Sequence, residues 1–275
     1  MIMPGYRLPG PTCGDAQPRD LDDGTTQPTP GIPPTTVCAT SPLFRDATPF
    51  LPPTEPDLSI LFTSSLNPTR GLSDADFGRA AATLGAEIAA IQAVAEVETS
   101  GNAFDDHGRP RILFERHYFH RLTGGRFDQS HATISAPTAG GYGKFSEQYG
   151  KLEEAYGLDA DAALRSASWG RFQIMGDNCR AAGFASVREF VNALTQTEAA
   201  HLDAFVAFVA ADQGMAEALR KKDWATFARR YNGPGYANNA YDTKLAAAYA
   251  QFATEAAPTP AATRSARQTL ERHRP

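Results

Sequence analysis

The prolines of this chain divide it into two parts of different character. Fourteen of its 20 prolines lie within residues 1–71, about a quarter of the 275-residue sequence. Because proline fixes φ and has no backbone N–H, so dense a set of prolines opposes helices and central strands. We therefore expect residues 1–71 to form an extended or irregular leader. Its stretches 43–51 and 58–62 are apolar enough to dock on the main domain or on a partner, and we expect the main domain. The folded domain should span residues 72–256, followed by a flexible basic tail over residues 257–275.

Composition excludes several classes of protein. With 42% hydrophobic residues the chain can bury one sizeable core, and its alanine content favours a mainly helical domain. A net charge of −5 argues against a protein that binds nucleic acid through overall positive charge. There is no run of 18 apolar residues, so we expect no membrane span. The N-terminus also lacks the charged and apolar regions of a secretory signal peptide, which indicates synthesis in the cytoplasm without one.

The cysteines and histidines do not have the spacing of a metal site. Cys13, Cys38 and Cys179 are an odd number and form no metal-binding motif. Cys13 and Cys38 can pair in an oxidising compartment or remain free thiols, and the sequence leaves both alternatives open. His117 and His120 are three residues apart, but neither an HExxH motif nor a third ligand accompanies them. We therefore expect no metal and no cofactor.

From residue 72 onwards, local signals predict a series of helices and a single β segment. Ser73 is a good N-cap, and Asp76, three residues later, completes a capping box. Thr195 and Ser186 mark the starts of two later helices. Further helices are predicted over residues 146–168, 186–194, 195–213, 215–230 and 237–255. The alternation in residues 111–119 predicts a short strand or hairpin, the one convincing β segment.

Glu98 ends an alanine-rich helix and is predicted to point inward. Ile88, Ile91 and Val94 recur at helical intervals, and Glu98 lies seven residues after Ile91 on the same stripe. Glu96 lies about 200° around the helix from Glu98 and should face water. Burial raises the pKa of a carboxyl, as a general acid near neutral pH requires. A cap or an ion pair with a nearby arginine is the alternative role for Glu98.

The segment SASWGRFQIMG, residues 166–176, is a candidate wall of a sugar-binding cleft. Gly170 allows a backbone to approach closely, Trp169 offers a stacking face for a sugar ring, and Gln173 offers an amide. Ser168 lies at the predicted end of the preceding helix and belongs to the same candidate site. The alternative is that the apolar residues of this segment, Trp169 among them, are simply part of the core.

Three other segments carry candidate site residues. In YNGPGY, residues 231–236, Tyr231 and Asn232 close a helix and either line a cleft or cap the helix. GGYG, residues 140–143, is neither a P-loop nor a dinucleotide fingerprint, and we interpret it as a mobile loop that brings Tyr142 to the cleft. In ILFERH, Glu115 and His117 should share a strand face with Leu113.

Taken in order, these motifs resemble those of the N-acetylmuramidase family of phage endolysins, a branch of the lysozyme-like superfamily. The resemblance covers roughly residues 72–253. It implies a mainly α, lysozyme-like α+β fold with one small β-hairpin region. The wider pattern, a helix-terminal glutamate followed by Ser-x-Gly-x-x-Gln-Ile and Tyr-Asn-Gly, is also similar to goose-type lysozymes and soluble lytic transglycosylases. The motifs that carry the resemblance are VETSGNAF (97–104), GRPRILFERHYF (108–119), GGYG (140–143), SWGRFQIMG (168–176) and YNGPGY (231–236).

The resemblance implies cleavage of the β-1,4 bond between N-acetylmuramic acid and N-acetylglucosamine in peptidoglycan, with Glu98 as catalytic acid. Glycosidases commonly use a second carboxylate as base or nucleophile. Glu115 is the candidate by position, although an ion pair or hydrogen bond within FERH explains it equally well. Asp105 and Asp106 are weaker candidates. In transglycosylase-like relatives one glutamate suffices because the acetamido group of the substrate assists, and this route stays open.

The expected setting is the periplasm, where a monomeric enzyme would act on peptidoglycan glycan strands. It would be released there as a phage endolysin or delivered as an antibacterial effector by a secretion system. Residues 1–71 are then a candidate docking segment for a delivery protein, and an immunity protein is a further candidate partner. The rival function is a wall-binding module that keeps the sugar cleft without its chemistry.

Overall fold

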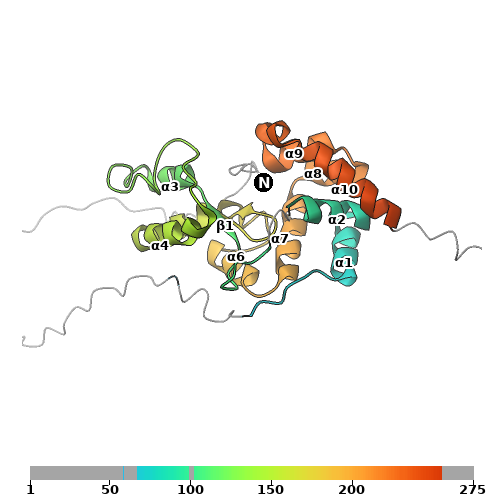
Figure 1. Ribbon diagram of the computed structural model, residues 1–275, viewed down its shortest axis with the longest axis horizontal. Helices are drawn as coiled ribbons and strands as arrows, with labels where there is room; N and C mark the ends of the chain where they lie inside the picture. The colour runs from blue at the N-terminus through green and yellow to red at the C-terminus, as the bar shows by residue number, and fades with distance from the viewer. Residues whose placement is uncertain (1–57, 59–66, 99–101, 256–275) are drawn as a thin grey trace, which may run out of the picture.

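Ten α-helices and one small sheet make up the part of the chain that the computed structural model describes, namely residues 58, 67–98 and 102–255 (Figure 1). This mostly helical architecture with one small antiparallel sheet confirms the α+β fold expected from the sequence. The helices are α1 (Asp74–Leu84), α2 (Ile88–Glu98), α3 (Arg116–Thr123), α4 (Gln148–Leu158), α5 (Ala160–Arg165), α6 (Val187–Leu194), α7 (Glu198–Ala211), α8 (Gln213–Lys221), α9 (Trp224–Asn232) and α10 (Tyr241–Glu255). The strands are β1 (Ile112–Phe114), β2 (Ala167–Trp169) and β3 (Ile174–Met175).

The helices form two groups on either side of the sheet (Figure 1). α3 and α4 lie on one side, and α1, α2, α8, α9 and α10 lie on the other, with α7 between the two groups. The last helix, α10, packs along α2, so the C-terminal helix supports the helix that ends at Glu98. α1 packs against both α2 and α7. The site of interest is therefore built from segments far apart in the sequence.

The three strands form an antiparallel sheet in the order β1-β2-β3. Ile112 pairs with Trp169 and Leu113 with Ser168 between the first two strands. Ser168 then pairs with Met175 across the β2–β3 hairpin. This register puts the turn of residues 170–173 at the end of the sheet that faces α2, because Arg171 donates a hydrogen bond to a carbonyl of that helix.

The helix expected over residues 146–168 is only partly present. α4 and α5 lie within it, and they are separated at Asp159, whose side chain caps α5 by accepting the Ala162 N–H at 3.0 Å. Residues 167–169 instead form β2, so the expectation of a single β segment is wrong. Every residue of β2 is buried, and a strand without polar alternation cannot be distinguished from a buried helix by its periodicity.

The strand predicted to hold Glu115 and His117 is shorter than expected. β1 ends at Phe114, and Glu115 is the N-cap residue of α3, the helix that contains His117. The prediction that these two residues share a strand face with Leu113 is therefore wrong. A helix begins here because the chain reaches the edge of the sheet, where the Glu115 N–H donates to the Ser166 carbonyl at 2.8 Å.

The predicted helix starts are mostly confirmed. Ser73 and Asp76 form the expected capping box of α1, and the Ser186 side chain caps α6. The next helix begins two residues later than expected, because Thr197 rather than Thr195 caps α7 by accepting the Ala200 N–H at 3.0 Å. Such small differences at helix ends are usual, since several Ser and Thr residues compete for the cap.

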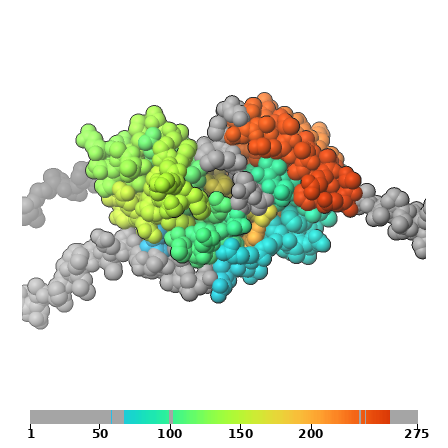
Figure 2. Space-filling view, in the orientation of Figure 1, coloured from blue at the N-terminus to red at the C-terminus, as the bar shows by residue number. Residues whose placement is uncertain are grey.

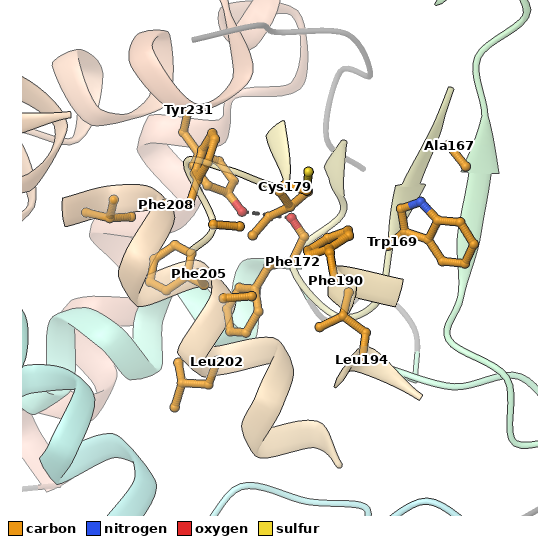
Figure 3. Packing of buried hydrophobic residues seen from close by; sticks show 14 of the residues in the cluster. Ala167, Trp169, Phe172, Cys179, Phe190, Leu194, Leu202, Phe205, Phe208 and Tyr231 are labelled. Atoms are coloured by element: carbon orange, nitrogen blue, oxygen red, sulfur yellow. Dashed lines mark hydrogen bonds between the residues drawn. The ribbon is translucent and has the colours of Figure 1, made fainter. Parts of the chain in front are cut away.

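Aromatic side chains fill the core between the sheet and α7 (Figure 3). Phe172, just before β3, stacks on Phe205 of α7 with ring centroids 4.6 Å apart. Tyr231 meets Phe205 edge-on and donates its hydroxyl hydrogen to the Phe172 carbonyl at 2.7 Å. Cys179 is also buried and is disulfide-bonded, whereas Cys13 and Cys38 lie outside the described residues. The YNGPGY segment thus packs directly against the segment that carries SWGRFQIMG.

The described part of the chain starts slightly before the expected domain. Thr69 pairs with Thr197 in an isolated parallel bridge, and the Gly71 N–H donates to Glu198 at 2.6 Å. Leu58 is buried in the core. The rest of the expected leader, residues 1–71, and the expected tail, residues 257–275, lie outside the described residues. In the described part, no single helix is long and apolar enough to cross a membrane, and α1 and α2, bent by 113°, reach that length and composition only as a pair.

Candidate active site

Glu98 lies at the C-terminal end of α2 with its carboxyl buried, as predicted. Its residue exposure is 9%, whereas Glu96 on the same helix is exposed. The hydroxyl of Tyr241, at the start of α10, donates to Glu98 Oε1. The predicted apolar stripe included Ile88, but Ile88 is 47% exposed. The buried stripe of α2 that leads to Glu98 therefore begins at Ile91. Glu96 and Glu98, which are only two residues apart on the same helix, therefore have opposite environments.

The Glu98 carboxyl holds a proton at neutral pH. Burial raises the pKa of Glu98 to about 8, although the Tyr241 hydrogen bond and the positive charge of Arg171 oppose the rise. Removal from water disfavours the carboxylate more strongly than these two neighbours favour it. A carboxyl with this pKa can donate a proton near pH 7 and can then act as a base.

Arg171 connects the turn between β2 and β3 to α2. Its Nη2 donates to the Ala95 carbonyl at 3.2 Å, one turn before Glu98, and its Nη1 forms an ion pair with Glu198 at the start of α7. The Arg171 backbone N–H donates to His201 Nδ1 at 2.9 Å. One arginine thus ties three elements together beside Glu98, and sequence reasoning did not single it out.

Gly170 fits this position for two reasons. Its φ is +69°, which a residue with a side chain rarely adopts, and a Cβ there would lie 2.6 Å from His201 Nδ1. The close approach expected from the sequence is therefore made by the imidazole of His201. Burial lowers the pKa of His201 to about 4, so the ring is neutral, donates from Nε2 to the Leu194 carbonyl and accepts at Nδ1.

The other predicted residues of SWGRFQIMG serve mainly to build the turn. Ser168 is buried and donates to Gln173 Oε1 at 2.9 Å, and Gln173 Nε2 donates to the Gly170 carbonyl at 2.8 Å. Trp169 is 1% exposed, and its indole N–H donates to the Leu164 carbonyl at 2.9 Å. Its ring offers no open face, so the expected sugar-stacking role does not fit and the core alternative does. Gln173 stays partly exposed beside the turn.

Tyr231 and Asn232 at the end of α9 come close to Glu98. Tyr231 is a core residue whose hydroxyl holds the Phe172 carbonyl, and its pKa is raised first by burial and then by the charge of Glu98. Asn232 is 4% exposed and lies beside the Tyr241 hydroxyl. Neither amide atom of Asn232 has a well-formed hydrogen bond within the described residues. The structure thus brings the Asn232 amide next to Tyr241, the residue whose hydroxyl donates to Glu98.

Glu115 belongs to a different part of the sheet. Its backbone bonds to Ser166, just before β2, whereas the turn that contacts α2 begins at Gly170, about 13 Å further along an extended strand. The Glu115 side chain is fully buried and lies 3.1 Å from His117 Nδ1. Tyr142, in the glycine-rich loop, is its other close neighbour. Within the described residues, no hydrogen bond or ion pair connects Glu115 to Glu98.

The two groups of helices leave the surface hollowed between them. Figure 2 shows this depression between the group that contains α3 and α4 and the group that contains α2 and α10. Within residues 58, 67–98 and 102–255, no group of three His, Cys, Asp or Glu side chains could hold a metal ion. His120, considered above as a metal ligand, pairs with Asp128 at 2.7 Å.

Comparison with known proteins assigns the chain to a family. Residues 87–253 match the family model of N-acetylmuramidase. Among solved structures, the chain is similar to the crystal structure of the Burkholderia AP3 phage endolysin, with 43% sequence identity and a TM-score of 0.64. That match covers 68% of this chain and 73% of the endolysin. No curated protein sequence matches. The chain therefore belongs to the N-acetylmuramidase family and is a glycoside hydrolase that acts on peptidoglycan.

Proposed function

We propose that this muramidase cleaves the β-1,4 bond between N-acetylmuramic acid and N-acetylglucosamine with Glu98 as its general acid. The observation that carries the proposal is the buried carboxyl of Glu98, whose pKa is raised to about 8 and which is held by Tyr241. A protonated carboxyl can donate its proton to the glycosidic oxygen as the bond breaks. Asn232 and Gln173 are the proposed sugar-binding amides, and Tyr142 is proposed to contact the glycan further along.

The second group of the mechanism is proposed to come from the substrate. The two oxygens of Glu115 are shielded from solvent, and Asp105 is occupied by an ion pair with Arg109 at 2.8 Å. Asp105 also accepts the His107 and Arg109 N–H groups, as a loop-forming residue does. A substrate acetamido group can instead stabilise the anomeric carbon, after which ionised Glu98 activates the incoming nucleophile. Water as the nucleophile gives hydrolysis.

The burial of Glu115 also favours a second candidate function, that of a lytic transglycosylase. If the 6-hydroxyl group of the muramic acid replaces water as the nucleophile, the product is a 1,6-anhydro sugar and a single glutamate suffices. Mass spectrometry of digested peptidoglycan separates the two reactions. Reducing muramic acid ends support hydrolysis, and anhydro ends support the transglycosylase.

Glu98→Gln is the direct test of the proposed acid. The amide keeps the size of the side chain and its acceptor for Tyr241 but cannot donate a proton, so we expect the rate of peptidoglycan digestion to fall by about 10²–10⁴-fold. Glu96→Gln, on the exposed face of the same helix, is the matched control and should keep normal activity. A Glu98→Gln enzyme with more than a tenth of the normal rate would show that Glu98 is not the acid.

For its biological setting we propose an endolysin, which the similarity to the Burkholderia AP3 phage endolysin supports. The alternative is an antibacterial effector of a secretion system, for which residues 1–71 would carry the delivery signal. A reporter fused to residues 1–71 tests the alternative. Secretion of the reporter, or its binding to a delivery protein, would favour the effector, and neither outcome is expected for an endolysin.

A further inference from the structure

Arg111 carries a positive charge that the described part of the protein does not pair. Within residues 58, 67–98 and 102–255, its guanidinium forms no ion pair and donates no hydrogen bond, although the residue is half-buried. The other half-buried arginines of the same ranges each donate to an oxygen of the protein, and they are Arg109, Arg116, Arg165, Arg171 and Arg230. A guanidinium has five N–H donors and no acceptor, so those of Arg111 are available to a ligand.

An exposed aromatic ring supports the Arg111 guanidinium without using those donors. The guanidinium carbon lies over the Phe145 ring, 4.2 Å from its centre, and Phe145 is 47% exposed. The ring attracts the cation through its electrons, and an arginine on such a ring can still bind a carboxylate through two parallel N–H groups. Arg111 and Phe145 together, called the Arg111–Phe145 platform below, are therefore suited to a ligand that carries a carboxylate.

The backbone of Arg111 is fixed beside the candidate active site. Its N–H donates to the Ala103 carbonyl at 2.9 Å, and its carbonyl accepts from the Gly170 N–H at 2.7 Å. Ala103 is five residues after Glu98, so covalent geometry alone keeps their Cα atoms within about 18 Å. Gly170 begins the turn whose Arg171 holds α2 one turn before Glu98. The Arg111–Phe145 platform therefore lies within reach of a glycan strand that is bound at the acid.

Phe145, the other half of the platform, is fixed by Gln148. Phe145 begins the short 3-10 helix η2 (Phe145–Glu147), which leads into α4 at the border of the depression in Figure 2. Gln148 Oε1 accepts the Phe114 N–H of β1 at 2.9 Å, and Gln148 Nε2 donates to the Lys144 carbonyl, next to Phe145, at 3.0 Å. The ring is thus fastened to the strand that follows Arg111. The Arg111–Phe145 platform is therefore preformed, which lowers the entropy cost of binding a ligand.

Muramic acid offers a carboxylate that fits this platform. The two sugars of peptidoglycan differ in one substituent, because muramic acid carries a lactyl group that N-acetylglucosamine lacks. The carboxyl of this lactyl group is either free or joined to a stem peptide, which has carboxylates of its own. A site that binds such a carboxylate fixes which of the two sugars occupies the platform. It thereby fixes which of the two alternating β-1,4 bonds lies at the acid.

We propose that Arg111, held over Phe145, binds a carboxylate of the lactyl substituent of muramic acid, either its own or that of the attached stem peptide, and so sets the register of the glycan strand. The proposal rests on the proposed function, because it names the group by which that site recognises its substrate. Arg111 contacts the substituent and not the scissile bond. It therefore contributes to binding and to the choice of bond, and the chemical step does not depend on it.

Arg111→Gln tests the proposal on soluble glycan strands of three kinds. The first kind is freed of stem peptides by an amidase and has free lactyl carboxylates. The second is the same material with every carboxyl coupled to methylamine and thus neutral, and the third keeps uncrosslinked stem peptides. On charged strands, we expect Arg111→Gln to raise KM about tenfold with kcat within about threefold of normal, since a hydrogen bond to a charged group contributes that much. On neutral strands, the variant and the unmodified protein should have the same KM.

Arg79→Gln is the matched control, because it removes the same charge from an exposed position on α1. It should match the unmodified protein on all three kinds of strand. If Arg111→Gln does not fold, as judged by circular dichroism, Arg111→Lys takes its place. Lysine keeps the charge but loses the paired donors, so we expect KM to rise about threefold on charged strands and not at all on neutral ones.

The pattern across the three kinds of strand decides the proposal. A rise in KM on the charged stem-free strands supports it and identifies the lactyl carboxylate, whereas a rise only on strands with stem peptides supports it and identifies a stem carboxylate. An equal rise on charged and neutral strands would overturn it, because Arg111 would then act without a carboxylate. An unchanged KM on both charged kinds would overturn it as well. Failure of the proposed function would instead appear as activity in Glu98→Gln, which these comparisons of KM do not involve.

Discussion

The buried acid should make the native protein less stable than its own inactive variant. At pH 7 the unfolded carboxyl of Glu98, with its ordinary pKa of 4.5, is ionised, whereas the native carboxyl, with a pKa of about 8, keeps its proton. Glutamine carries no charge in either state and offers the same acceptor to Tyr241. We therefore expect Glu98→Gln to stabilise the protein while it abolishes activity.

The magnitude follows from the two pKa values of Glu98. Between pH 4.5 and pH 8 the native state binds more protons than the unfolded state, so the stability of the unmodified protein falls as the pH rises through this window. Each pH unit contributes about 1.4 kcal/mol, which gives about 3 kcal/mol at pH 7 and about 5 kcal/mol above pH 8. For a domain of this size, 3 kcal/mol corresponds to a rise in Tm of roughly 6–12 °C at pH 7.

Thermal unfolding of both proteins from pH 4 to pH 9 measures this effect. The difference in Tm should be close to zero at pH 4 and should grow steadily up to about pH 8. Glu96→Gln should unfold with the unmodified protein at every pH, because Glu96 is exposed. If Glu98→Gln and the unmodified protein do not differ in Tm, or if their difference in Tm does not change with pH, the assignment of a buried, protonated carboxyl is refuted.

Three further predictions concern the residues around this acid. Tyr241→Phe removes a hydrogen bond that lowers the pKa of Glu98, so the alkaline limb of the kcat/KM profile should move to higher pH, and an unmoved limb would contradict this role. Gly170→Ala should cost at least about 2 kcal/mol in urea unfolding, from strain plus contact with His201, whereas Gly124→Ala, which has a φ of +63° and open space, should cost about 1 kcal/mol. The pKa of about 4 for His201 predicts that Glu98→Gln loses about 3 kcal/mol of stability as the pH falls from 6.5 to 4, because the unfolded imidazole gains a proton there. A flat stability profile over that range would show that His201 is not buried in its neutral form.

The sequence predicted the acid well because its environment is set locally. Helical periodicity alone places Glu98 inward and Glu96 outward, and both placements are confirmed. The identity of its hydrogen-bond partner was not predictable in this way, since Tyr241 is 143 residues later in the chain.

The predictions for the sheet were right only for its first strand, β1, because the surroundings of the other strands depend on distant segments. Trp169 was expected to be open to a sugar, but β2 is the middle strand and buries both of its faces. Glu115 was placed on a strand because alternation continues beyond Phe114, whereas the chain turns into α3 at the edge of the sheet. The contact of Glu115 with Tyr142 comes from a loop whose path no local pattern specifies.

The bridge between Thr69 and Thr197 has a practical consequence for anyone who trims this protein. A truncation at Leu72, where the proline pattern places the domain boundary, removes the Thr69 pairing and the Gly71 N–H that Glu198 accepts. Glu198 is also the partner of Arg171, which holds the helix that carries the acid. A shortened enzyme should therefore begin at or before residue 58, because residues 67–71, which look like linker, form part of the framework of the active site, and Leu58 is buried in the core.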